Sequence, residues 1–141
     1  MRPFEFFVEK EDVKKSSKDM ALAKSLIKDM IKRIKDVNAL EFTKFSKIVF
    51  ENLYDALRDF ADAILAVNGF KSYSHQASFA YLANYGFDDS VLDSLDKYRY
   101  IRNGSKYYGY DISIEEAKSL LEFYKRIKTK IDDIIKKERL I

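Results

Sequence analysis

The chain of 141 residues has no cysteine and no tryptophan, and it has one histidine, one proline and four glycines. Without cysteine it can form no disulfide framework, no thiolate nucleophile and no cysteine zinc site. One histidine also excludes a multi-histidine metal site. An all-β sandwich or barrel needs many tight turns, which require more glycine and proline than this chain has. We therefore expect a helical domain without a metal ion.

Long apolar runs and glycine-rich nucleotide motifs are also missing. The longest uninterrupted apolar stretch is residues 63–67, far short of the roughly 20 residues of a membrane-spanning helix. The first residues lack the apolar region and cleavage site of a signal peptide. Neither GxxxxGK[ST] nor GxGxxG occurs in the chain. We expect a cytoplasmic protein that makes no membrane contact and uses no cofactor.

The chain is rich in apolar and charged residues, and these alternate in the pattern of helices. Hydrophobic residues make up 47% and charged residues 35%, with a formal net charge of +3. Apolar side chains recur at steps of three and four residues, which indicates amphipathic helices. We predict an all-α, five-helix, mostly up-and-down antiparallel bundle that forms a single domain over residues 1–141. Four of the five helices are predicted at about 13–37, 43–67, 75–85 and 113–137. The fourth in chain order follows a cap at Asp88 or Asp89 and includes Ile101.

Three features define the predicted helix ends and the N-terminal segment. Ser74 is a candidate N-cap of the third helix, and Ser113 with Glu116 forms a candidate capping box for the last. Asn103-Gly104 is predicted to interrupt the fourth helix near its end. The N-terminal strip, residues 1–10, is too apolar to lie in water, so we predict that it packs on the bundle or across a dimer.

The densest polar and aromatic cluster is residues 98–110, which hold five of the 10 tyrosines, three cationic side chains and two glycines. Arginine offers planar donors that suit phosphate, and tyrosine offers a stacking face with a polar tip. Aromatic residues interleaved with cations are typical of single-stranded nucleic-acid binding. The alternative is a helix end whose tyrosines pack on neighbouring helices while its arginines pair with nearby aspartates.

The helical pattern, with Arg102-Asn103 near the end of the fourth helix and a turn at 107–109, resembles the HEPN superfamily (higher eukaryotes and prokaryotes nucleotide-binding). Residues 53–60 and 69–77 are similar to a small archaeal branch of it. The resemblance implies a helical homodimer. Active members are metal-independent ribonucleases whose motif, an arginine, often an asparagine, and then a histidine, meets its copy at the dimer interface. Many members are toxins paired with a minimal nucleotidyltransferase, and others are inactive binding modules.

On this resemblance the motif arginine is Arg102 and its polar follower is Asn103, whereas Tyr107 and Tyr108 occupy the place of the histidine. Tyrosine has an ordinary pKa of about 10 and is a poor base at neutral pH. The predicted catalytic set is therefore Arg102 with His75, Tyr107 or Tyr108. The predicted nucleotide- or RNA-binding residues are Arg99, Arg102, Asn103, Lys106, Tyr107 and Tyr108.

His75 and two carboxylates complete the candidate site. His75 is either a polar residue at a helix start or an imidazole that approaches Arg102, within one protomer or across a dimer. Family members often hold the motif arginine with a carboxylate on the second helix, and Asp55 or Asp62 is the expected partner of Arg102. Alternatively, these aspartates form local pairs on an exposed face.

Three functions follow as hypotheses. The first is a dimeric HEPN-type module that binds a nucleotide or RNA and works with a minimal nucleotidyltransferase. The second is a metal-independent ribonuclease toxin that cleaves RNA at a dimer-interface cleft. The third is a structural dimer without a ligand. The sequence alone identifies neither the ligand nor the partner.

Overall fold

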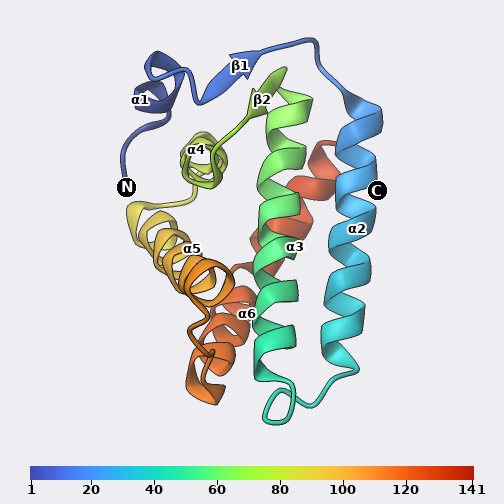
Figure 1. Cartoon of the computed structure of the whole chain (residues 1–141). Helices are drawn as coiled ribbons and strands as arrows, with labels where there is room; N and C mark the ends of the chain where they lie inside the picture. Colours follow the sequence, from blue (N-terminus) through green and yellow to red (C-terminus); the bar gives the residue numbers. More distant parts are fainter.

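The computed structural model describes residues 1–141, and most of them are helical (Figure 1). The predicted all-α bundle is confirmed, with six α-helices rather than five and one small two-stranded sheet. No helix combines the length and the apolar character needed to cross a membrane. The elements in chain order are α1 (Phe4–Glu9), β1 (Val13–Lys15), α2 (Met20–Asn38), α3 (Ser46–Val67), β2 (Phe70–Ser72), α4 (His75–Tyr81), the 3-10 helix η1 (Leu82–Tyr85), α5 (Asp89–Tyr108) and α6 (Ile114–Lys137).

Helix α3 is the centre of the fold. It packs against α2 along most of its length and also contacts α4, α5 and α6. Figure 1 shows α2 and α3 side by side in opposite directions, with α6 crossing behind α3 and with α4 seen end-on. The largest fully buried side chains include Phe50, Tyr54 and Phe60 of α3. The wide apolar stripe expected on this helix therefore reflects contact with several neighbours.

The first predicted helix begins later than expected. Val13–Lys15 form β1, which pairs antiparallel with β2 so that Val13 lies opposite Ser72. The helix starts at Met20 because the Asp19 side chain accepts a hydrogen bond of 2.9 Å from the backbone N–H of Leu22. An N-cap of this kind satisfies a backbone donor at the helix start, whereas Val13, a β-branched residue, suits a strand.

The N-terminal strip forms α1 and packs on the bundle. Phe4 and Phe7 are buried in a small second cluster with Leu65 of α3 and with Ala77 and Ala80 of α4. Each contact removes apolar surface from water. Helix α1 therefore lies against α4, the helix that begins with His75.

Helix α5 continues past the predicted interruption. It runs through Asn103 and Gly104 to Tyr108, and Gly109, in the left-handed conformation with φ 70°, ends it. Gly104 keeps a helical conformation, so the expected break occurs five residues later, at the next glycine. The predicted caps at Ser74 and at Ser113 with Glu116 are both present.

Candidate functional site

Helix α5 presents Arg99, Arg102 and Lys106 at steps of three and four residues, so they share one face. On that face Arg102 Nη2 donates to Asp55 Oδ1 of α3 at 3.1 Å. Of the two carboxylates expected to hold Arg102, Asp55 does so. Asp62 instead accepts from Arg58 Nε at 2.8 Å and from the Ser78 hydroxyl at 2.7 Å.

Asp55 also ties this face to α2. Its second oxygen lies 3.7 Å from Arg33 Nη1, and Arg33 Nε donates to Asp59 Oδ2 at 3.0 Å. Burial raises the pKa of Asp59 to about 6, although the guanidinium of Arg33 lowers it. Asp55, which positions Arg102, is therefore itself paired with Arg33 of α2.

His75 and Arg102 meet through Tyr54 within one protomer. His75 is the first residue of α4, and its Nδ1 shares a hydrogen bond of 2.7 Å with the Tyr54 hydroxyl. The two rings stack with centroids 5.8 Å apart, and the Arg102 guanidinium carbon lies 5.4 Å from the centroid of the same tyrosine ring. The imidazole and the guanidinium of Arg102 thus contact one buried phenol.

The surroundings of His75 keep its imidazole neutral. Its pKa is lowered to about 4, chiefly by burial and then by the charges of Arg58, Arg102, Arg99 and Lys106, in that order. Each of these four cations disfavours a second positive charge close by. Burial also raises the pKa of Tyr54, which keeps its hydroxyl protonated. At neutral pH the pair therefore consists of an uncharged ring and an uncharged phenol.

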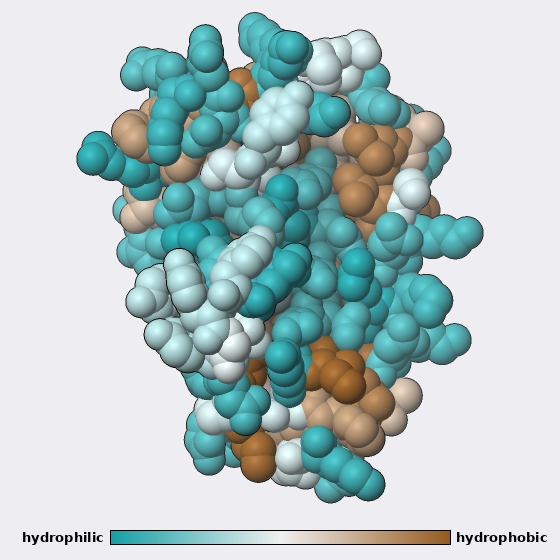
Figure 2. Space-filling model, in the orientation of Figure 1, coloured by the Kyte–Doolittle hydropathy of each residue, from teal (hydrophilic) through white to brown (hydrophobic).

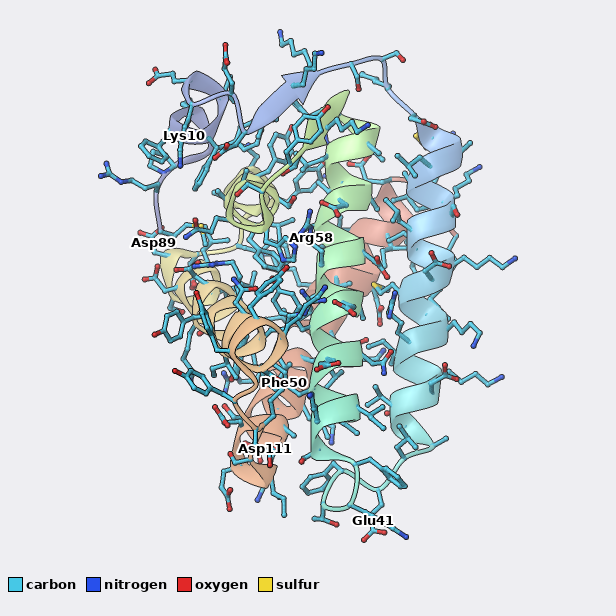
Figure 3. All side chains as sticks on the ribbon, viewed as in Figure 1. Lys10, Glu41, Phe50, Arg58, Asp89 and Asp111 are labelled. Carbon is cyan, nitrogen blue, oxygen red and sulfur yellow. The ribbon has the colours of Figure 1, made fainter.

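Most of these cations already have a carboxylate partner. Besides the pairs of Arg58 and Arg102, Arg99 Nε donates to Asp96 Oδ1 at 2.8 Å. Lys106 forms no ion pair, and its side chain is exposed. Figure 3 shows the Arg58 side chain in the space bordered by α3, α4 and α5, and the surface between α5 and α2 is hydrophilic in Figure 2. This set of side chains, His75 with Arg58, Arg99, Arg102 and Lys106, is called the cationic face below.

The remaining predicted site residues lie elsewhere. Asn103, Tyr107 and Tyr108 line a separate groove of about 560 Å³ at the end of α5, together with Tyr100 and Tyr110. In Figure 2 a group of pale, weakly polar side chains projects there. Successive helical residues are rotated by about 100°, so Tyr107 lies about 140° around α5 from Arg102. Asn103 lies between them, and the Lys106 ammonium is 5.7 Å from the centroid of the Tyr107 ring, so the groove borders the cationic face. Arg99, Arg102 and Lys106 do not line this groove, so the residues predicted as one cluster occupy two adjoining surfaces of α5.

Sequence reasoning overlooked two residues that support the cationic face, Tyr54 beneath His75 and Arg102, and Arg33 beside Asp55. Tyr54 falls within the apolar stripe of α3, and its only signal is a phenol in place of an aliphatic side chain on a buried surface. Arg33 belongs to the lysine-rich side of α2 and differs from its neighbours only in carrying a guanidinium. Neither signal identifies a partner without the fold.

The cationic face can donate to an anionic group from several directions. Guanidinium forks, an ammonium and a neutral imidazole all supply N–H donors. No group of three or more histidine, aspartate or glutamate side chains is arranged to hold a metal ion. Comparisons of the chain with models of protein families, with curated proteins and with solved structures found no match.

Proposed function

We propose that this chain is a HEPN-type domain that binds the phosphate groups of a nucleotide or RNA at the cationic face. The observation that carries the proposal is that His75 and Arg102 contact the same Tyr54 ring, while the charges of Arg58, Arg99 and Lys106 also lower the pKa of the imidazole. Arg58, Arg99 and Arg102 are each paired with one carboxylate, and Lys106 has none. The guanidinium groups and the ammonium therefore keep N–H donors that an anion can use.

A bound phosphate would change the charge state of His75. Its negative oxygens would offset the cations that now lower the pKa of the imidazole, so this pKa should rise from about 4 toward its ordinary range. Because the chain has one histidine, its imidazole gives a single assignable set of NMR signals. Titrating these signals against pH, with and without inorganic phosphate or ATP, measures the change directly.

Binding itself tests the site. We expect a short fluorescent single-stranded RNA to bind in an anisotropy assay, and Arg102→Ala to weaken binding by about 10- to 100-fold, the range for a lost charged hydrogen bond. The matched control is Arg126→Ala, which removes an exposed α6 guanidinium that stacks only on Phe123. Equal affinity of Arg102→Ala and wild type, with both variants folded by circular dichroism, contradicts the proposed site.

A ribonuclease is the second candidate, favoured by the contact of His75 and Arg102 with the same tyrosine. An imidazole beside an arginine can take a proton from a ribose hydroxyl while the guanidinium stabilises the phosphate. Cleavage of RNA in the presence of EDTA by wild type, and its loss in His75→Ala, supports catalysis. Equal rates in both proteins, including no cleavage in either, exclude a catalytic His75.

We also propose a homodimer and a minimal nucleotidyltransferase as partner, on the resemblance noted above. Leu22 and Ile31 of α2 and Ile48 of α3 are 42–48% exposed, which leaves apolar surface for a partner. Light scattering of the purified chain measures its mass in solution. A dimer that binds neither phosphate nor RNA supports the structural alternative instead.

A further inference from the structure

The groove at the end of α5 exposes four tyrosines. Tyr100, Tyr107, Tyr108 and Tyr110 are 66–75% exposed, and all four line it. A tyrosine ring left in water forgoes most of the stabilisation that its burial gives. Several such rings around one hollow therefore form an exposed aromatic surface of the kind that binds a ligand.

The groove depends on a glycine inside the helix. A Cβ atom at position 104 would lie 3.0 Å from Cδ2 of Tyr110, and the Tyr110 backbone N–H donates to the Gly104 carbonyl at 3.2 Å. Glycine is a poor helix former, yet here it lets the Tyr110 ring fold back over α5. The rings of Tyr108 and Tyr110 lie 6.0 Å apart at 33°. The position of the Tyr110 ring, and hence its packing beside Tyr108, therefore depends on Gly104 within α5.

The charged groups lining the groove are both carboxylates. Asp111 accepts a hydrogen bond through Oδ1 from Ile112, and Glu116 accepts one through Oε1 from Ser113, so each uses one oxygen within the chain. Asn103 adds an amide with both a donor and an acceptor. Acceptors beside aromatic faces disfavour a phosphate and suit a flat, uncharged ring with amino groups at its edge.

We propose that this groove stacks a nucleobase of the ligand whose phosphate lies at the cationic face. The inference rests on the proposed function and assigns it a second subsite. Each phosphate-facing residue of α5 precedes a groove residue, as Arg102 precedes Asn103 and Lys106 precedes Tyr107. A helix is about 10–12 Å wide with its side chains, and roughly three to four stacked nucleotides of one strand span that width. The ligand class is therefore a short single-stranded RNA segment that crosses α5.

Neutral nucleosides separate this subsite from the phosphate site, because they carry a base and no phosphate. We would titrate the ring-labelled protein with adenosine and with guanosine and follow the tyrosine NMR signals. We expect saturable shifts in wild type and in Arg102→Ala, and at least about tenfold weaker binding in Tyr108→Leu, since stacking on one aromatic ring contributes about that factor or more. Tyr73→Leu is the matched control, because Tyr73 is 62% exposed and lies outside the groove.

Gly104→Ala is a second test that keeps the fold. Alanine favours the helix, so the variant should unfold no more easily than wild type. Its new methyl group should shift the Tyr110 ring by a few tenths of an ångström and weaken nucleoside binding. The inference is overturned if Tyr108→Leu and Tyr73→Leu bind nucleosides equally. It is also overturned if tetramethylammonium shifts the groove signals and nucleosides do not, since the groove would then be a cation site. Phosphate titration of His75 reports on the cationic face whatever the nucleosides do.

Discussion

At the residue scale, His75 links the stability of the fold to pH. Its pKa is lowered to about 4 in the folded chain, so the unfolded chain binds a proton more readily between about pH 6.5 and 4. Stability is then lost as the pH falls through this window. Asp59 acts in the opposite direction, because its pKa is raised to about 6 and the folded chain binds the proton more readily between about pH 4 and 6.

The comparison of wild type with His75→Gln isolates the histidine. We expect wild type to lose on the order of 1–2 kcal/mol more stability than the variant between pH 7 and 4.5, after allowance for the partial exposure of the ring. Urea unfolding at a series of pH values measures the difference. Parallel stability curves for the two proteins would contradict the assigned surroundings of His75.

Asp55 should restrain the arginine that it holds. In Asp55→Asn the site gains one net positive charge and Arg102 loses its ionic partner. We predict several-fold tighter binding of RNA at low salt and a stability loss of about 1–3 kcal/mol, since a buried charge is left without its partner. Anisotropy and urea unfolding measure the two effects. The control is Asp36→Asn, which removes an exposed carboxylate paired with Lys32; weaker RNA binding in Asp55→Asn than in this control would contradict the prediction.

At the element scale, helix periodicity and caps were predictable and helix starts were less so. The apolar stripe of α3 and the caps of α4 and α6 depend on local spacing, which is visible in one chain. The strand at Val13–Lys15 depends on pairing with distant residues, since Lys14 lies opposite Lys71, 57 positions away, and no local pattern encodes that contact. Likewise, Arg102 and Tyr107 looked like one site because they are neighbours in sequence, whereas the helix turns them to different sides.

The capping box of α6 gives a prediction at this scale. Ser113 accepts from the Glu116 backbone N–H at 3.1 Å, and the Glu116 side chain accepts from the Ser113 backbone N–H at 3.0 Å. Ser113→Ala should lower stability by about 1 kcal/mol. Ser25→Ala, at an exposed position within α2, should change stability by only a few tenths of that amount. Equal midpoints of urea unfolding for the two variants would show that the cap contributes nothing.

At the scale of the whole molecule, α1 fastens the N-terminal segment to the helix that carries His75. A chain that starts at Lys10 loses the buried rings of Phe4 and Phe7. We predict a stability loss of about 3 kcal/mol, from roughly 1.5–3 kcal/mol for each buried phenylalanine less the relaxation of the surface left behind. Because α1 packs on Ala77 and Ala80, the NMR signals of His75 should shift as well.

Single substitutions in α1 check this without truncation. Phe7→Ala should reproduce most of the loss because its ring is 3% exposed, whereas Val8→Ala, at 41% exposed, should cost little. Thermal unfolding of the three proteins against wild type measures the effects. A truncated chain as stable as wild type would contradict the prediction that packing of α1 on α4 stabilises the fold.

The position of the cationic face and the groove on one helix, α5, also has a consequence for the evolution of this protein. Residues 102 and 106 face the cationic side, and residues 103 and 107 face the groove, so the two surfaces interleave along one helix without sharing a side chain. Under the binding mode proposed above, a mutation at 103 would alter which base is preferred without removing any of the cations that face the phosphate. In that binding mode, base selectivity and phosphate affinity can be changed by substitutions at different positions of the same helix.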